Sequence, residues 1–169
     1  MKKAAIILAS LAVVAYGGFR VWSILFPGDE AEIREMLGEL STAATFRVSS
    51  KPLTQMGKAA ELTGFFTESI EIQIKGPEGV IRRIMGRPAL QQAAMSAQTM
   101  GGGFSIQFKD IIVMLGEQKG VASCRMTAVA KGAGEPTPWV QILEFDVQEH
   151  ESGWKVNKIR VVEAVERIQ

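Results

Sequence analysis

Two acidic side chains within predicted strands are the first candidates for chemistry. Glu68 shares its strand parity with Phe66 and Ile70, and Asp110 shares its parity with Phe108. A carboxylate on the buried face of a strand can have a raised pKa and can act as a general base. A β-bulge would shift the parity and leave either carboxylate in solvent, so each candidate has a structural alternative.

Arg125 is a third charged candidate, in the middle of a predicted strand. It could meet an acidic ligand, or it could form a structural ion pair with Glu144 across the sheet. If the domain holds an open cavity, Phe66, Phe108 and Trp139 are expected to line it with Arg125 and to bind a small apolar ligand. If side chains fill that space instead, these aromatic residues belong to the core.

No motif predicts a metal, a cofactor or a nucleic acid. The only cysteine, Cys124, is expected to be a buried inert thiol, and neither zinc-type nor calcium-type ligand spacing occurs. The glycines at 101–103 lack the Lys-Ser/Thr of a phosphate loop. Arg82 and Arg83 belong to a small basic cluster, but residues 29–169 carry a net charge of −2, which argues against nucleic-acid binding.

The first 28 residues are far more hydrophobic than the rest of this 169-residue chain. They include 19 hydrophobic residues, and only Arg20 interrupts the 23-residue stretch Ala4–Phe26. A helix of that length is about 34 Å long, which spans the ~30 Å hydrocarbon core, and Arg20 near its far end can reach the headgroups. Lys2 and Lys3 favour a cytoplasmic amino terminus. We therefore predict a single-pass membrane anchor with an extracytoplasmic domain at 29–169.

A cleaved signal peptide is the alternative for the same segment. Lys2 and Lys3 would form its n-region, Ala4–Ala15 its apolar core, and Val13-Val14-Ala15 or Ala15-Tyr16-Gly17 its cleavage site. Cleavage would release a secreted or periplasmic protein whose new terminus carries the apolar stretch Val21–Phe26. Because such an apolar terminus would be exposed to water, the uncleaved anchor is favoured over the cleaved signal peptide.

Hydrophobic periodicity divides the remaining chain into helices followed by strands. Helical spacing and start signals predict helices over 30–45, 52–64 and 87–100. Period-two alternation and glycine-containing turns predict strands over 65–74, 80–85, 104–115, 121–130, 139–148 and 154–166, with a bulge near Asp110. Helices beside a meander of strands predict an α+β domain with its helices on one face of a curved sheet.

This order of elements resembles the nuclear transport factor 2-like (NTF2-like) superfamily, which includes SnoaL-like and ketosteroid-isomerase-like proteins. The resemblance covers about residues 29–165. It is carried by Phe65–Ile74, Gly86-Arg87-Pro88-Ala89-Leu90, Ile106–Val113 and the closing strand Glu151-Ser152-Gly153-Trp154-Lys155-Val156…Ile159-Arg160-Val161. It implies a cone-shaped fold in which three helices pack on a strongly curved antiparallel sheet, often with a pocket inside the cone.

The resemblance leaves function open, because this fold hosts enzymes and binding domains alike. Its enzymes often use an Asp or His base with a Tyr or acid partner. Here the sole tyrosine, Tyr16, lies in the predicted membrane segment and the sole histidine, His150, in a predicted turn. We therefore expect a membrane-anchored, non-catalytic domain that binds a small ligand or partner protein at the cell envelope. The partner could be a second copy of the chain in a homodimer. The alternative is an exported isomerase or dehydratase with Glu68 or Asp110 as base.

Overall fold

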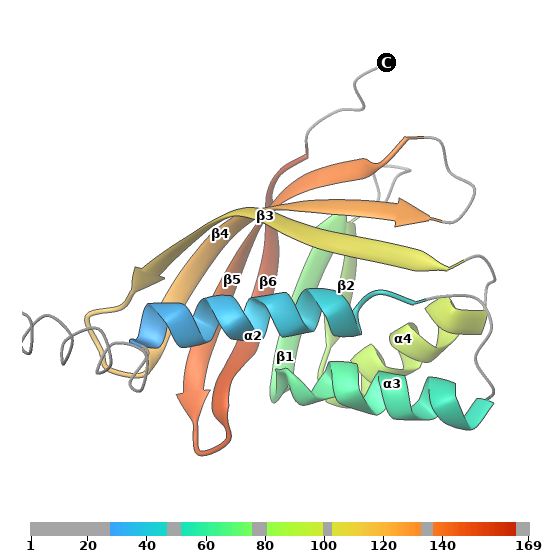
Figure 1. Cartoon of the computed structure of the whole chain (residues 1–169), viewed down its shortest axis with the longest axis horizontal. Helices are drawn as coiled ribbons and strands as arrows, with labels where there is room; N and C mark the ends of the chain where they lie inside the picture. The colour runs from blue at the N-terminus through green and yellow to red at the C-terminus, as the bar shows by residue number, and fades with distance from the viewer. Residues whose placement is uncertain (1–27, 47–51, 76–80, 100–102, 133–136, 165–169) are drawn as a thin grey trace, which may run out of the picture.

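The computed structural model describes residues 28–46, 52–75, 81–99, 103–132 and 137–164. The elements there are α2 (Asp29–Ala43), α3 (Pro52–Gly64), β1 (Phe66–Lys75), β2 (Ile81–Met85), α4 (Arg87–Thr99), β3 (Phe104–Leu115), β4 (Val121–Gly132), β5 (Trp139–His150) and β6 (Gly153–Ala164) (Figure 1). Every helix and strand predicted beyond residue 28 is present, with small differences at the ends.

The predicted membrane segment at 1–28 lies outside the described residues, except for Gly28. Across the ranges that are described, none of the helices combines the length and the apolar character that a membrane crossing requires. The prediction of an anchor rests on the sequence alone.

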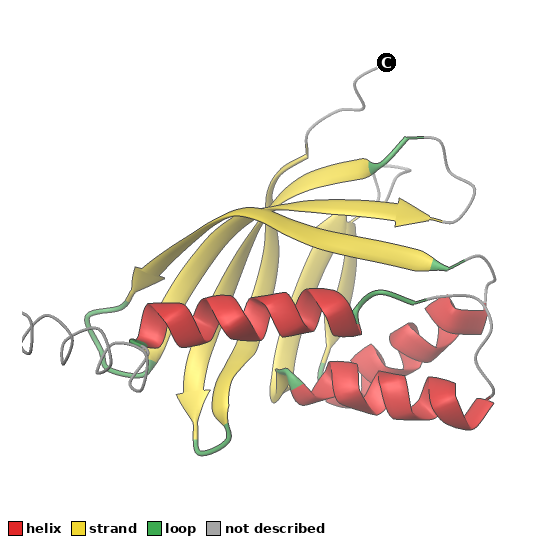
Figure 2. Ribbon diagram, viewed as in Figure 1, coloured by secondary structure: helices red, strands yellow, loops and turns green. Residues whose placement is uncertain are grey.

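Helix α2 packs on the concave side of the sheet with one face buried and the other exposed. Gly28 occupies the N-cap position and Asp29 is the first helical residue, and acidic side chains in the first turn favour the helix dipole. Apolar residues recur at intervals of three and four, which places them on one buried face: Ile33, Met36, Leu37 and Leu40. That face lies against the concave side of the sheet, which wraps around α2 (Figure 2).

The six strands form one sheet in the order β2-β1-β6-β5-β4-β3. Neighbours joined by short turns are antiparallel, but β1 and β6 pair in parallel. The expectation of a wholly antiparallel sheet is therefore wrong at this one junction. A tight turn between two strands forces them to pair antiparallel, and no tight turn joins β1 to β6. These two strands are far apart along the chain, so their direction of pairing is free.

Strict alternation along β4 and β5 gives the centre of the sheet a buried, mainly apolar face and a more exposed face. In β4 the buried positions are Ala122, Cys124, Met126, Ala128 and Ala130, and in β5 they are Gln141, Leu143, Phe145 and Val147. Phe145 is 1% exposed, and its ring meets Phe108 edge-on at a centroid distance of 5.5 Å. Aromatic and aliphatic side chains therefore pack the space between α2 and the centre of the sheet.

A β-bulge interrupts β3, as predicted near Asp110. The register with β4 shifts between Lys109 and Ile112, and Asp110 has a φ of +52°, which side-chain-bearing residues seldom adopt. Arg34 of α2 reaches this point and donates from Nη1 to the carbonyl oxygen of Ile111 at 2.7 Å. The bulge is thus tied to the central helix.

Candidate functional site

The charged residues singled out from the sequence lie on the surface. Glu68 is exposed because the pairing of β1 with β6 shifts register between Phe66 and Glu71, which removes Glu68 from the buried face. Asp110 is exposed at the bulge of β3. Neither carboxylate shares a pocket with the aromatic candidates.

Arg125 lies on the outer face of β4, directly opposite Glu144 on β5, as the strand alternation predicts. Among the described residues, however, Glu144 pairs with Arg160 of β6 at 3.4 Å and not with Arg125. Arg160 also contacts Asp146 at 3.2 Å, so the ion pairs of this face run between β5 and β6. Arg125 points away from the concave interior.

The aromatic candidates do not form one site. Phe66 is 4% exposed and belongs to the core, and Phe108 packs partly buried against that core. Trp139 is half-buried at the start of β5. None of the three lines the pocket that the structure forms beside α2.

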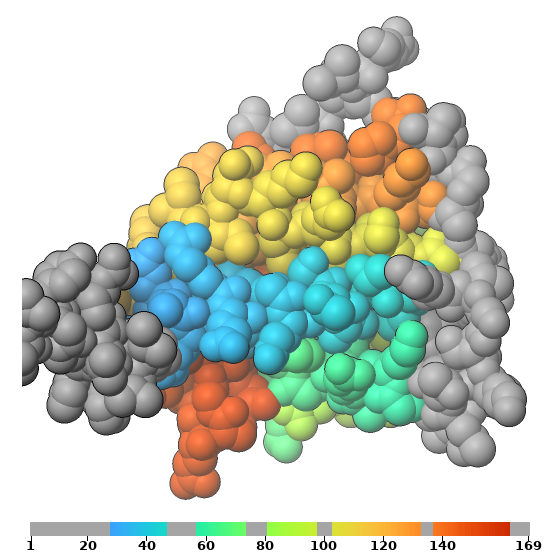
Figure 3. All heavy atoms as spheres, viewed as in Figure 1, coloured from blue at the N-terminus to red at the C-terminus, as the bar shows by residue number. Residues whose placement is uncertain are grey.

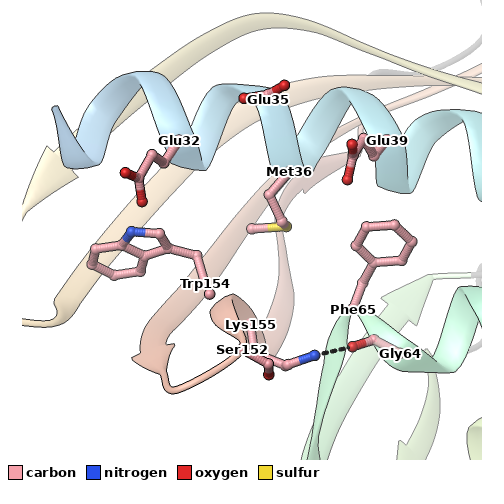
Figure 4. Close-up of a pocket in the computed structure, with 10 residues that line it drawn as sticks. Glu32, Glu35, Met36, Glu39, Gly64, Phe65, Ser152, Trp154 and Lys155 are labelled. Carbon is pink, nitrogen blue, oxygen red and sulfur yellow. Dashed lines mark hydrogen bonds between the residues drawn. The ribbon is translucent and has the colours of Figure 1, made fainter. Parts of the chain in front are cut away.

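That pocket has a volume of about 410 Å³ and lies between α2, the α3–β1 junction and the start of β6. In the space-filling view, α2 lies on the surface, with the β5–β6 hairpin and the α3 region meeting it along one side (Figure 3). The lining residues are Glu32, Glu35, Met36, Glu39, Gly64, Phe65, Ser152, Gly153, Trp154 and Lys155 (Figure 4). Three segments that are distant in sequence therefore build one concave site.

The α2 wall of the pocket is acidic. Glu32, Glu35 and Glu39 are spaced by three and four residues, which sets them along one side of the helix, and all three are exposed. Figure 4 shows Glu32 and Glu39 directed from α2 toward the side where Trp154 and Phe65 lie, with Met36 between them. The wall thus alternates carboxylates with an apolar thioether.

The opposite wall is aromatic. Trp154 is 5% exposed, and its indole Nε1 has no hydrogen-bond partner among the described residues. Figure 4 shows this nitrogen on the ring edge that faces α2 and Glu32. Phe65 is half-buried and presents its ring below Glu39. An unpartnered buried donor costs roughly 1–3 kcal/mol, so the Trp154 N–H is a polar group that an acceptor would stabilise.

Backbone and lysine contacts hold the floor of the pocket in place. The Lys155 ammonium donates to the carbonyl oxygen of Gly64 (Figure 4). The Val156 amide donates to the carbonyl oxygen of Phe65 at 2.9 Å. Gly153, with a φ of +96°, makes the tight turn that starts β6. These bonds fix β6 against the end of α3, so the pocket is formed without a ligand.

Sequence reasoning did not find this site, although its pieces were visible. From the sequence, Gly153-Trp154-Lys155 is only part of the predicted closing strand, and Glu32 is one of several charges in the predicted helix over 30–45. The signal that could have drawn attention was the spacing of Glu32, Glu35 and Glu39 on one side of α2. Across the pocket, Phe65 is 26 residues beyond Glu39, and Trp154 is more than a hundred residues beyond it along the chain.

Elsewhere in the described ranges, another hollow does not combine charge with aromatic rings as this pocket does. It has a volume of about 400 Å³ and lies over the outer side of α4, lined by Pro88, Gln91, Gln92, Met95 and Ser96. No three His, Cys, Asp or Glu side chains within these ranges gather in a way that could hold a metal ion. The pocket beside α2 is the concave site with both charged and aromatic walls.

Comparison by sequence gives no assignment: no model of a protein family matches the chain, and no curated protein matches it. Comparison by structure gives many matches. An NTF2-like protein with a cystatin-like fold from Novosphingobium aromaticivorans is 16% identical, with 90% of each chain covered and a TM-score of 0.60. A protein of unknown function from Mycobacterium tuberculosis is 18% identical, with 77% of this chain and 72% of that chain covered and a TM-score of 0.60.

A third similar structure comes from Streptomyces avermitilis and is provisionally named a dehydratase of the NTF2-like family. It is 11% identical, with 82% of this chain and 97% of that chain covered, and its TM-score is 0.62. At sequence identities this low, structural similarity is evidence of a common fold and of nothing more. The described domain therefore has an NTF2-like fold, as the order of its elements predicted, and its function must be argued from its own residues.

Proposed function

We propose that this protein is a binding domain of NTF2-like fold, held at a membrane of the cell envelope, whose site is the pocket beside α2. The observation that carries the proposal is the pre-formed concavity, in which Glu32 and Glu39 of α2 face Trp154 and Phe65. A concave site of a few hundred Å³ with an apolar floor and a few polar groups is typical of small-molecule binding. Pairing with a second copy or with another envelope protein stays a prediction.

The enzymatic alternative requires a carboxylate in an apolar interior, where burial would raise its pKa toward that of a useful base. Glu68 and Asp110, the residues it relied on, are both exposed. The carboxylates of the pocket lie at its exposed α2 rim. These positions favour binding over proton abstraction.

The support for membrane anchoring is the sequence of residues 1–28, in which Lys2 and Lys3 precede a stretch long enough to span a bilayer. The test is to express the full chain in bacteria and to wash the membranes with alkaline carbonate. We expect the chain to stay in the membrane fraction at its full mass of 18.4 kDa. A shortened chain in the periplasmic fraction would show that a signal peptide had been removed.

The pocket is tested by blocking it. Ser152 lines the pocket from the β5–β6 turn, and its neighbour Glu151 is exposed in the same turn without lining the pocket. A small-molecule thermal-shift screen on the wild-type chain identifies ligands. We expect these ligands not to bind the Ser152→Trp variant and still to bind the Glu151→Trp variant. Equal loss or equal retention in the two variants would place the binding site elsewhere.

A further inference from the structure

We propose that the ligand of this pocket is an organic cation, an aliphatic amine or diamine whose methylene chain lies over Met36. The inference rests on the proposed binding function and adds the chemical class of the ligand. Three glutamates and one lysine line the pocket, which leaves a formal charge of −2. The Lys155 ammonium is already bonded to the Gly64 carbonyl, so it does not compensate the carboxylates of α2 directly.

The spacing of the acids matches an elongated cation with a charge at each end. Glu32 and Glu39 are seven residues apart, which corresponds to about 10.5 Å along a helix axis. Met36, 8% exposed, lies between them and offers an apolar surface to a methylene chain. An extended diamine can therefore place one ammonium group beside each carboxylate while its chain contacts the thioether.

Trp154 places a buried Nε1 donor, unpartnered among the described residues, at the Glu32 end of the pocket. Glu32 rather than the amine is the acceptor for it, because Glu32 lies on the wall that this nitrogen faces. A carboxylate has two oxygens, so Glu32 can accept the indole N–H with one and an ammonium N–H with the other. Binding of an amine would then order Glu32 and satisfy the indole at the same time.

Phe65 contributes at the other end. Its ring is half-buried below Glu39, so an ammonium group held by that carboxylate would lie on the Glu39 side of the ring, where a cation–π contact is favourable. An anion would meet the carboxylates of Glu32 and Glu39 and would be repelled, and a neutral chain would gain only the apolar contact. The two walls together therefore favour a positive charge.

The test uses the full chain in nonionic detergent micelles and titrates α,ω-diamines from diaminobutane to diaminooctane by calorimetry, with empty micelles as the blank. We expect a Kd on the order of 100 μM for the longer diamines, weakening with added salt and with shortening of the chain. Octanediol serves as the neutral probe of equal length and octanedioic acid as the anionic one. Both should bind at least tenfold more weakly.

Matched variants locate the contacts. Glu32→Gln and Glu39→Gln should each weaken the diamine by about five- to tenfold, because each removes one ion pair. Glu61→Gln makes the same change at an exposed residue of α3 outside the pocket and should leave the affinity unaltered. In a proton–nitrogen spectrum, the indole signal assigned by Trp154→Phe should shift on titration of the wild-type chain and stay in place in Glu32→Gln.

The outcomes separate the ligand class from the proposed function. If octanediol or octanedioic acid binds as tightly as the diamine and Ser152→Trp abolishes that binding, the pocket is a binding site but the cation is wrong. If no diamine binds at millimolar concentration, or if Glu61→Gln weakens binding as much as Glu32→Gln, the inference is also overturned. Ser152-dependent binding of other compounds would then still support the proposed function.

Discussion

The guanidinium of Arg34 on α2 donates from Nη1 to the carbonyl oxygen of Ile111 on β3, at 2.7 Å. The carbonyl belongs to the residue that follows Asp110, where the ladder between β3 and β4 is interrupted. The same guanidinium pairs with Glu30 one turn earlier on α2, at 2.9 Å. One side chain thus links the central helix to the irregular point of an edge strand.

We predict that Arg34→Met destabilises the domain by about 1 kcal/mol, since the variant keeps the apolar stem but leaves the Ile111 carbonyl without its charged donor. Denaturant unfolding followed by circular dichroism measures the change. Glu30→Gln is the control, because it removes only an exposed ion pair and should cost less than about 0.5 kcal/mol. Equal losses in the two variants would mean that the contact with Ile111 contributes nothing.

Substitutions at Asp110 should depend on backbone conformation. Its φ of +52° is easy for glycine and unfavourable for β-branched residues. Asp110→Gly should be neutral or stabilising by up to about 1 kcal/mol, whereas Asp110→Val should cost about 1–2 kcal/mol. Lys109→Val, at the neighbouring exposed strand position, is the comparison and should change stability little. Equal tolerance of valine at both positions would contradict the bulge.

The edge-on contact between Phe108 and Phe145 should be measurable as a coupling. Phe145→Ala is expected to cost roughly 3–5 kcal/mol because the side chain is almost fully buried. A double-mutant cycle with Phe108→Leu and Phe145→Leu should give a coupling of about 0.5–1.5 kcal/mol for the ring pair. Additive losses in the cycle would show that the two rings contribute only through the area they bury.

The ion pair of Glu71 should make stability depend on pH. The hydrogen bond from the Lys158 ammonium, at 2.8 Å, is the main cause that lowers the pKa of the Glu71 carboxyl in the folded state. A lowered folded pKa gives stability that is present above the unfolded value, near 4.3, and is lost as the pH falls through the folded pKa.

The difference in Tm between the wild-type chain and Glu71→Gln should therefore shrink on acidification from about pH 6 to about pH 3. In a Lys158→Met background the difference should be smaller and less dependent on pH. Only the weaker contact of Glu71 with Arg83, at 3.9 Å, would then remain from the two ion pairs of this carboxylate. A difference that stays constant with pH would contradict the assigned role of Lys158.

The thiol of Cys124 should be inert in the folded chain. Burial is the main cause that raises its pKa to about 11, from an ordinary value of 9.0, and the residue is fully buried. At pH 8 the thiolate fraction is then about a hundredfold lower than in the unfolded chain, so a disulfide reagent should react at least that much more slowly. Reaction is followed by absorbance, with Cys124→Ala as the blank, and comparable rates with and without denaturant would contradict the burial.

The elements and the fold were predictable because they depend on local patterns. Period-two alternation located the long strands, and the interrupted pattern around Asp110 predicted the bulge. Glu68 illustrates the limit of such reasoning, since one register shift in β1 changes which parity is buried. The parallel pairing of β1 with β6 was missed for a similar reason, because nothing local to either strand encodes a partner so distant in sequence.

The pocket was beyond prediction because it is a relation between segments rather than a motif. Glu32, Trp154 and Phe65 come from α2, β6 and the residue between α3 and β1, and each has an ordinary structural explanation taken singly. Only the three-dimensional packing sets carboxylates opposite aromatic rings. For Arg125 the position was predictable but the partner was not. Strand alternation places it opposite Glu144, as predicted, but the side chain that pairs with Glu144 is Arg160 of β6.

The two borders of the sheet have a consequence for the behaviour of the protein in a crowded compartment. An unpaired strand is a template for intermolecular sheet growth and so for aggregation. At one border β2 is only five residues long and exposes Arg82 and Arg83, and at the other the bulge at Asp110 breaks β3 into two shorter stretches. A copy approaching either border would therefore meet two arginine side chains at β2 or an interrupted ladder at β3, and both features disfavour a continuous sheet between copies.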